Sequence, residues 1–320
     1  MRRRTARRRT RSSRSAHSGS GRALVAGATA RGPRRSSAGR LGGMTLPVAA
    51  SSLADIAGEL ALSVGRVIHA KRAVGVDVAA TKSSLTDVVT AADREAERLL
   101  TEGLRERRPE DGILGEEGAS IAGTSGVTWV VDPIDGTVNY LYNIPAYAVS
   151  VAATVTDGAP GTMSDGRRAI AGAVYLPVTG ELFTASEGGG AFLGAARLHG
   201  PSETTLDTTL LGTGFGYTAE RRTEQVEVLR RVLPRVRDIR RMGSAAMDLC
   251  MLAAGRLDAY YERGLQPWDY AAAALIAREA GAQVRGLGDA APGEELLIAG
   301  TPAIAGELAA IIAEAYDSLR

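Results

Sequence analysis

Two aspartates follow an apolar run near the middle of the chain, and their spacing suits metal chemistry. The run at residues 129–131 leads into Asp132 and Asp135, with Pro133 and Ile134 between them. Because Pro133 fixes its own φ and bends the chain, both carboxylates can face one point beyond the predicted strand end. The carbonyl oxygen of Ile134 would add another hard oxygen ligand of the kind that Mg²⁺ prefers. This segment therefore predicts a divalent-cation site.

The two residues that follow are suited to phosphate binding. Gly136 and Thr137 would present backbone N–H groups at the start of a helix, where anions bind readily. A plainer interpretation is also open, in which Asp132 caps a turn and Asp135 caps the helix. The isolated pattern D-x-x-D-G does not separate the two interpretations.

Further carboxylates lie on both sides of this segment. Glu116 and Glu117 stand between two glycines after a short apolar piece, and Asp269 follows Trp268 at the start of an Ala-rich helix. Each is unremarkable alone, because the two glutamates fit solvated loop charges and Asp269 fits a helix N-cap. The joint pattern with Asp132 is far more specific than any of its parts.

In this combination the sequence resembles the inositol monophosphatase family. The matching segments are G-E-E at residues 115–117, W-V-V-D-P-I-D-G-T-V-N at 129–139 and W-D-Y-A-A at 268–272. Their order and spacing fit the family over most of residues 50–320. The resemblance implies a phosphoric monoester hydrolase that cleaves a small phosphorylated polyol with a metal-activated water. It also implies Mg²⁺ as cofactor, lithium sensitivity, a homodimer and a layered αβαβα fold.

The resemblance implies specific metal ligands. Glu116, Asp132 and the carbonyl of Ile134 would hold one Mg²⁺ ion, and Asp132, Asp135 and Asp269 a second. A third, looser ion would use Glu116 and water. Two such ions can clamp the attacking and leaving oxygens of an in-line displacement.

Three further residues match positions near the family's catalytic centre. Thr137 and Asp93 match the pair that orients the attacking water, with Asp93 polarising the hydroxyl. Thr90-x-x-Asp93 is also a helix-capping pattern, so a purely structural role for Asp93 remains open. Lys82 matches a lysine near the site, and an exposed loop lysine is the alternative.

The resemblance also implies a set of substrate contacts. They are Asp135, Gly136, Thr137, Ala245 and Glu262. Ser244, in G-S-A-A, is a further candidate at the same helix start. The alternative for Glu262 is an ordinary surface glutamate.

The metal motif alone does not name the substrate. Asn139-Tyr140 and Tyr261-Glu262 favour inositol 1-phosphate within the family. Histidinol phosphate, fructose 1,6-bisphosphate and adenosine 3′,5′-bisphosphate remain alternatives. A regulatory binding protein, in place of an enzyme, is also an open alternative. Some bacterial members of the family bind transcription or ribosomal-RNA machinery, and an Arg-rich tail could contact RNA.

Other phosphatase chemistries fit poorly. Cys250 and Arg256 have the C-x5-R spacing of cysteine phosphatases, but the residues between them are apolar and helix-forming, so the thiolate would lack an anion nest. Asp132 and Asp135 do not have the D-x-D spacing of aspartyl-phosphate enzymes. With three scattered histidines and one cysteine, the chain offers little material for zinc and none for an intrachain disulfide.

The charge distribution separates a basic tail from an acidic body. Residues 1–43 hold 13 of the 38 basic residues and no acidic one, which leaves 25 basic against 36 acidic residues in the remainder. We expect residues 1–43 to be a disordered tail, or an artefact of a mis-assigned start, with Met44 as the alternative. An acidic body argues against nucleic-acid binding by the folded part.

The sequence also bears on the location of the protein. No apolar run is long enough to span a membrane. A single cysteine cannot form an intrachain disulfide, which favours the reducing cytoplasm.

Apolar periodicity predicts helices and strands in alternation after the tail. The predicted helices are residues 53–73, 90–104, 220–232, 244–254, 268–280 and 303–316. The predicted strands are residues 128–131, 147–156, 170–176, 181–185, 208–211, 257–261 and 296–299. We predict an N-terminal α+β half over residues 44–195 that carries the metal motifs, and a C-terminal α/β half over residues 196–320 that completes the site.

Overall fold

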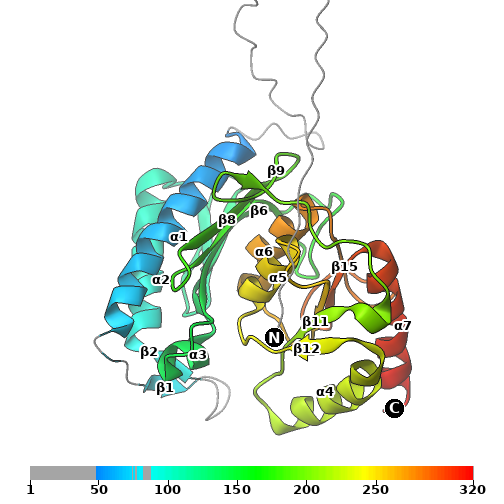
Figure 1. Ribbon diagram of the computed structural model, residues 1–320. Helices are drawn as coiled ribbons and strands as arrows, with labels where there is room; N and C mark the ends of the chain where they lie inside the picture. The colour runs from blue at the N-terminus through cyan, green and yellow to red at the C-terminus, as the bar shows by residue number, and fades with distance from the viewer. Residues whose placement is uncertain (1–47, 74, 76–77, 82–87, 320) are drawn as a thin grey trace, which may run out of the picture. The chain divides into compact units, whose positions relative to one another are not determined.

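The computed structural model describes residues 48–73, 75, 78–81 and 88–319, all within the compact unit formed by residues 39–320 (Figure 1). The predicted tail and Lys82 lie outside these residues. No helix in the described part of the chain is both long and apolar enough to cross a membrane.

The elements follow one another as helices, then strands, then an alternation of both. The helices are α1 (Ala50–Arg72), α2 (Ala91–Arg107), α3 (Thr137–Tyr142), α4 (Ala219–Val232), α5 (Ala245–Ala253), α6 (Pro267–Glu279) and α7 (Pro302–Asp317). The strands up to residue 200 are β1 (Val78–Thr81), β2 (Val88–Thr90), β3 (Gly112–Gly115), β4 (Ser120–Ile121), β5 (Thr128–Asp135), β6 (Ala148–Val155), β7 (Arg168–Leu176), β8 (Glu181–Ser186), β9 (Gly190–Leu193) and β10 (Ala196–Arg197). The later strands are β11 (Leu210–Thr213), β12 (Asp238–Arg240), β13 (Ala259–Glu262), β14 (Gln283–Arg285) and β15 (Leu297–Gly300).

The strands of the described residues form a two-stranded pair, β1-β2, and two larger sheets. The first larger sheet has the order β10-β9-β8-β7-β6-β5-β3-β4, and all its pairs are antiparallel except β3 with β5. The second has the order β12-β11-β13-β15-β14, with β11 parallel to both neighbours. The first sheet ends at Arg197 and the second begins at Leu210, near the predicted boundary at residue 195. The division into two halves stays a prediction.

Buried side chains arrange these elements in five layers. One apolar cluster joins α1 and α2 to one face of the first sheet, and a second joins its other face to α5, α6 and the inner face of the second sheet. A third cluster joins the outer face of the second sheet to α4 and α7. Figure 1 shows α1 and α2 on one side of the first sheet and α5 and α6 on the other. The predicted αβαβα layering is confirmed.

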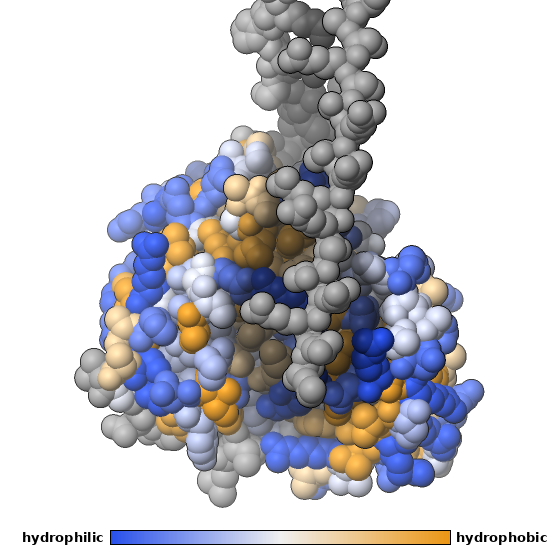
Figure 2. Space-filling model, viewed as in Figure 1, coloured by the Kyte–Doolittle hydropathy of each residue, from blue (hydrophilic) through white to orange (hydrophobic). Residues whose placement is uncertain are grey.

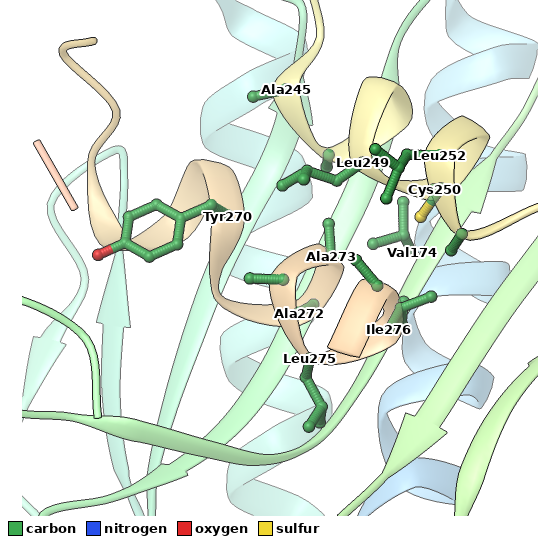
Figure 3. Packing of buried hydrophobic residues seen from close by; sticks show 14 of the residues in the cluster. Val174, Ala245, Leu249, Cys250, Leu252, Tyr270, Ala272, Ala273, Leu275 and Ile276 are labelled. Carbon is green, nitrogen blue, oxygen red and sulfur yellow. The ribbon is translucent and has the colours of Figure 1, made fainter. Parts of the chain in front are cut away.

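Strand β5 shows how the sequence dictates the layering. Trp129 and Val131 pack toward α1 and α2, whereas Val130 between them packs toward α5 and α6, as the two-residue period of a strand requires. The middle layer is rich in alanine, so helix and sheet approach closely (Figure 3). A Cβ on Gly172 of β7 would lie 3.0 Å from the Cα of Ala272 in α6. Small residues thus set the depth at which α6 lies on the sheet.

The helices and strands predicted from periodicity all form, with boundaries shifted by a few residues. The prediction that the paired aspartates lie beyond the end of their strand is wrong. Strand β5 continues to Asp135, and its register against β6 becomes irregular between Asp132 and Asp135. Pro133 has no N–H for the ladder, so the bend occurs inside the strand as a bulge.

The surface is mixed in polarity. On the face shown in Figure 2, hydrophobic residues are interspersed among hydrophilic ones. Tyr142, the last residue of α3, and Ile144 are exposed large hydrophobic residues, at 72% and 46% exposed. The homodimer stays a prediction.

Candidate active site

Parallel pairing of β3 and β5 brings two predicted ligands together. Gly115 at the end of β3 is in register with Val131 of β5, and the N–H of Glu116 donates to the Val131 carbonyl at 3.3 Å. Glu116 and Asp132, which follow these two residues, therefore lie side by side at the point where β3 ends and β5 continues.

The bulge in β5 and the start of α5 orient the paired aspartates. Asp132 is 1% exposed, and one carboxylate oxygen accepts the N–H of Ile134 at 3.0 Å. Asp135 is 8% exposed, and its Oδ2 accepts from the Ser244 hydroxyl at 2.6 Å and from the Ala246 N–H at 2.7 Å. The N-cap of α3 is Gly136, with φ of 97°, so the interpretation of Asp135 as the helix cap is wrong.

Asp269 reaches the site from the start of α6. Its Oδ2 accepts the Gln266 N–H at 2.7 Å in a capping box, with Gln266 as the N-cap and Pro267 in the first turn. Asp269 is therefore the third residue of the helix and not its N-cap. Its side chain faces the same cavity as Asp132 and Asp135.

The carboxylates oppose one another's ionisation. Burial raises the pKa of Asp132 well above its usual range, and the charges of Glu116, Asp135 and Asp269 raise it further. Burial and the Asp135 and Glu116 charges do the same to the pKa of Asp269. Burial also raises the pKa of Asp135 to about 6, against the lowering effect of its bonds from Ser244 and the α5 backbone. A divalent cation between these groups would relieve this repulsion.

The donor set suits a hard cation, although the side chains are not drawn together as ligands. In the described part of the chain, no three His, Cys, Asp or Glu side chains converge closely enough to hold a metal ion as they stand. Three of the four carboxylates, those of Asp132, Asp135 and Asp269, already accept hydrogen bonds from N–H or hydroxyl groups of the chain. Clustered carboxylates with raised pKa values nevertheless fit Mg²⁺, which prefers oxygen ligands and keeps part of its water shell.

Asp93 contacts the site through Thr137. The Thr137 hydroxyl lies 3.1 Å from Asp93 Oδ1 and 3.0 Å from the Ile134 carbonyl, so both acceptors share one proton. Asp93 also accepts from the backbone and hydroxyl of Thr90, the N-cap of α2. The capping role and the contact with Thr137 coexist, and burial raises the pKa of Asp93.

The alternative interpretation of Glu262 as an ordinary surface glutamate is wrong. Glu262 is partly buried, lines the cavity and accepts the Tyr260 hydroxyl at 2.5 Å. Burial raises its pKa to about 7, and Tyr260 opposes that rise. Ser244, the N-cap of α5, and Ala245 line the same cavity.

One cavity of about 450 Å³ collects nearly every residue that the sequence nominated. The nominated residues in its lining are Glu116, Asp132, Ile134, Asp135, Gly136, Thr137, Ser244, Ala245, Glu262 and Asp269. Asp93 lies behind Thr137, and Lys82 lies outside the described residues. The structure therefore brings together segments up to 153 positions apart, from Glu116 to Asp269.

Sequence reasoning missed two buried acids that act on the nominated residues or on the segments that carry them. Glu97 accepts the N–H of Glu117 at 2.7 Å and the N–H of Ala119 at 2.8 Å, which ties α2 to the loop that carries Glu116. Its position four residues after Asp93, on the same face of α2, was an available signal. Asp248 is the single charged residue in the apolar helix α5, and burial beside Glu262 raises its pKa well above the usual range.

The structure also argues against a cysteine phosphatase site at Cys250. Cys250 is fully buried among leucine and alanine side chains of α5 and α6 (Figure 3). Burial raises the pKa of its thiol well above the usual value, so the nucleophilic thiolate is disfavoured.

Comparison with known proteins agrees with this geometry. The family model described as the inositol monophosphatase family matches residues 48–318. The chain belongs to this family. The predicted family, fold and enzyme class are therefore confirmed.

Individual relatives within the family carry different names. The chain is 50% identical over 241 residues to the inositol-1-monophosphatase SuhB of Mycobacterium tuberculosis, covering 72% of this chain and 80% of the relative. A solved structure of Mycobacterium tuberculosis SuhB matches with a TM-score of 0.69 and 43% identity, covering 83% of this chain and 98% of that one. The Nus factor SuhB of Escherichia coli is 38% identical over 229 residues, covering 71% of this chain and 82% of the relative.

Proposed function

We propose that the protein is a Mg²⁺-dependent phosphomonoesterase that converts inositol 1-phosphate and water to inositol and phosphate. The observation that carries the proposal is that Glu116, Asp132, Asp135 and Asp269 line one cavity, where their charges raise one another's pKa values. The 50% identity to a relative named inositol-1-monophosphatase supports the choice of substrate. The family alternatives, histidinol phosphate, fructose 1,6-bisphosphate and adenosine 3′,5′-bisphosphate, are the comparison substrates.

The chain's own residues would hold two or three Mg²⁺ ions. Glu116, Asp132 and the Ile134 carbonyl would bind one, and Asp132, Asp135 and Asp269 a second. When bound, Mg²⁺ lowers the pKa of water and offsets phosphate charge. Competition by lithium at the second position is expected from the family.

Thr137 and Asp93 would orient the attacking water. While the Thr137 hydroxyl donates to Asp93 Oδ1 at 3.1 Å, its oxygen lone pairs can accept a hydrogen bond from the attacking water. That arrangement would hold the water oxygen toward phosphorus, opposite the leaving alcohol. Gly136 and Thr137, which line the cavity, would donate backbone N–H groups to the phosphate.

Glu262 and Ala245 would recognise the polyol. The Glu262 carboxylate, held by Tyr260, would accept from sugar hydroxyls once it is ionised. Ser244 would act through Asp135, to which it donates at 2.6 Å, rather than on the substrate itself.

Phosphate release with and without Mg²⁺ tests the proposal. Asp132→Asn should reduce turnover of inositol 1-phosphate by at least about 100-fold with the fold retained, because it removes charge from the ligand shared by both ions. Circular dichroism and the melting midpoint check the fold. Full activity in excess chelator, or in the Asn variant, would refute the metal mechanism.

A second candidate function is binding to transcription machinery, favoured by the relative named Nus factor SuhB. It does not require turnover. Intact RNA or polymerase binding by the Asp132→Asn variant, without detectable phosphatase activity in the parent, would favour that candidate.

A further inference from the structure

Helix α4 carries a buried polar side chain that the proposed mechanism does not use. Gln225 is 5% exposed and lies on the inner face of the helix, where the other two buried residues are Val228 and Val232. An amide in such a place costs free energy unless its donor and acceptor groups are both bonded. An apolar side chain would avoid that cost, so the role of the amide is sought in its contacts.

The Gln225 amide bridges two separate segments of the chain. Its Oε1 accepts the Gly216 N–H at 2.8 Å, and its Nε2 donates to the Arg263 carbonyl at 3.1 Å. A backbone N–H can only donate and a carbonyl can only accept, so these partners fix which end of the amide is which. Gln225 can therefore hold both segments only in this orientation.

The two segments lie at the ends of neighbouring strands of the second sheet. Strands β11 and β13 are parallel, and Thr213 at the end of β11 is in register with Tyr261. Residues 214–218 and 262–266, at and after these strand ends, line the active-site cavity, whereas Gln225 is not among the lining residues. Gln225 therefore holds the cavity wall without forming part of its surface.

Both contacts lead to Glu262, the proposed polyol contact. Arg263 follows Glu262 directly in the chain. Gly214 lies two residues before Gly216, and its backbone packs so closely against Glu262 that a Cβ on Gly214 would overlap the carboxylate. A shift of either segment would therefore move the Glu262 carboxylate or the backbone that supports it.

We propose that Gln225 is a positioning residue that fixes the Glu262 carboxylate for recognition of the polyol part of the substrate. It does not touch the substrate. Without the amide, the Gly216 N–H and the Arg263 carbonyl lose their partner and must turn toward water, which loosens both segments. Recognition of polyols should weaken, and the metal and phosphate chemistry should not. This inference rests on the proposed function for the role of Glu262.

Replacement of Gln225 by methionine tests the role, because methionine is similar in length and suits the apolar face of α4 without a strong donor or acceptor. In Gln225→Met the KM for inositol 1-phosphate should rise about 10-fold, with kcat within about 3-fold of the parent, since the lost bonds place a binding group. The KM for an aryl phosphate, which has no hydroxyls for Glu262, should stay within about 2-fold. Gln225→Leu should act in the same direction and replaces Gln225→Met if that variant does not fold.

A double variant and a surface control separate positioning from general stabilisation. Added to Glu262→Gln, the Gln225→Met change should alter the KM for inositol 1-phosphate by less than about 2-fold, because it acts through a carboxylate that is already gone. Glu227→Gln, in an exposed pair with Arg230 at 2.9 Å on the same helix, should leave both KM values unchanged. Equal KM increases for the two substrates in Gln225→Met, or independent effects in the double variant, would overturn the inference.

Binding of free inositol separates this inference from the proposed function. Broadening of the NMR signals of inositol on addition of protein reports the polyol contacts without metal, phosphate or turnover. Loss of this broadening in both Gln225→Met and Glu262→Gln supports the inference even if the parent hydrolyses no phosphate ester. If inositol 1-phosphate is hydrolysed while Gln225→Met keeps the inositol binding and KM of the parent, the positioning role fails and the phosphatase assignment stands. A parent with neither turnover nor inositol binding would overturn both.

Discussion

Glu97→Gln changes one atom in the carboxylate that anchors the loop carrying Glu116. In the parent, each carboxylate oxygen accepts one backbone N–H, from Glu117 at 2.7 Å and from Ala119 at 2.8 Å. Glutamine can accept only one of these bonds and must turn its NH₂ toward the other donor. Gly115 offers no relief, because its backbone already lies against the Glu97 carboxylate.

The expected magnitude follows from that loss. Glu97 is 6% exposed, so the lost hydrogen bond is charge-assisted and poorly replaced by water, worth about 1.5 to 3 kcal/mol. If this free energy is lost from the conformation that positions Glu116 for Mg²⁺ binding, the Mg²⁺ concentration for half-maximal activity should rise by roughly 10-fold to 150-fold. The kcat at saturating Mg²⁺ should stay within about 3-fold of the parent, because the loop is displaced and not removed.

Glu102→Gln on the same helix is the matched control. Glu102 pairs with Arg98 at 2.7 Å, but both side chains are 55% exposed, so the change should cost less than about 0.5 kcal/mol. Mg²⁺ titrations of phosphate release and urea unfolding are measured on parent and both variants. A lower unfolding free energy in Glu97→Gln with an unchanged Mg²⁺ requirement would refute the positioning role and leave Glu97 as a stabilising residue only.

Three other expectations concern the polyol contacts, the tail and acid stability. Glu262→Gln should lower kcat/KM for inositol 1-phosphate by roughly 5-fold to 150-fold and leave an aryl phosphate, which lacks such hydroxyls, nearly unaffected; an equal decline for both substrates would contradict the assignment. A chain that begins at Met44 should match the full chain in melting midpoint and specific activity, because residues 1–43 show no periodic apolar pattern, and a large loss would show that they contribute to the fold. Hydrogen bonding from Arg168 lowers the pKa of Asp157 to about 2, so the pair stabilises the folded state above pH 4 and loses this effect as the pH falls toward 2. Asp157→Asn should therefore cost about 1 kcal/mol at pH 7, discounted for partial exposure, and the difference from the parent should shrink toward pH 2; a constant difference in unfolding free energy across that range would argue against the ion pair.

The elements of the fold were largely readable from the sequence. Apolar periodicity is a local property, and it marked α1, α5, α6 and the central strands because each buries one face or both in an apolar layer. Short edge strands such as β12 and β14 escaped notice, since three residues are too few to show a period. The bulge in β5 was also missed, because pairing with β6 extends the strand through Pro133.

The nominated site residues came from motif and resemblance, and the cavity collects them. Asp132, Asp135 and Asp269 are unremarkable alone, and their joint order along the chain was the specific signal. Glu97 and Asp248 gave only weak local signals. Glu97 accepts hydrogen bonds from residues 117 and 119, and the charge of Glu262 raises the pKa of Asp248; both effects arise only in the folded chain.

The sequence by itself determined the chemistry that this protein has available, namely carboxylates in three separate segments, a Gly-Thr turn that we predict to bind phosphate, and few thiol or imidazole groups. Only the tertiary structure decided which charges share a space. Parallel pairing of β3 with β5 sets Glu116 beside Asp132, and the start of α6 adds Asp269. The same folding brings Arg221 and Arg241 to one cavity with them. Coulomb interactions depend on distance through space and not along the chain, so raised pKa values and opposed charges in one cavity arise only once the chain is folded.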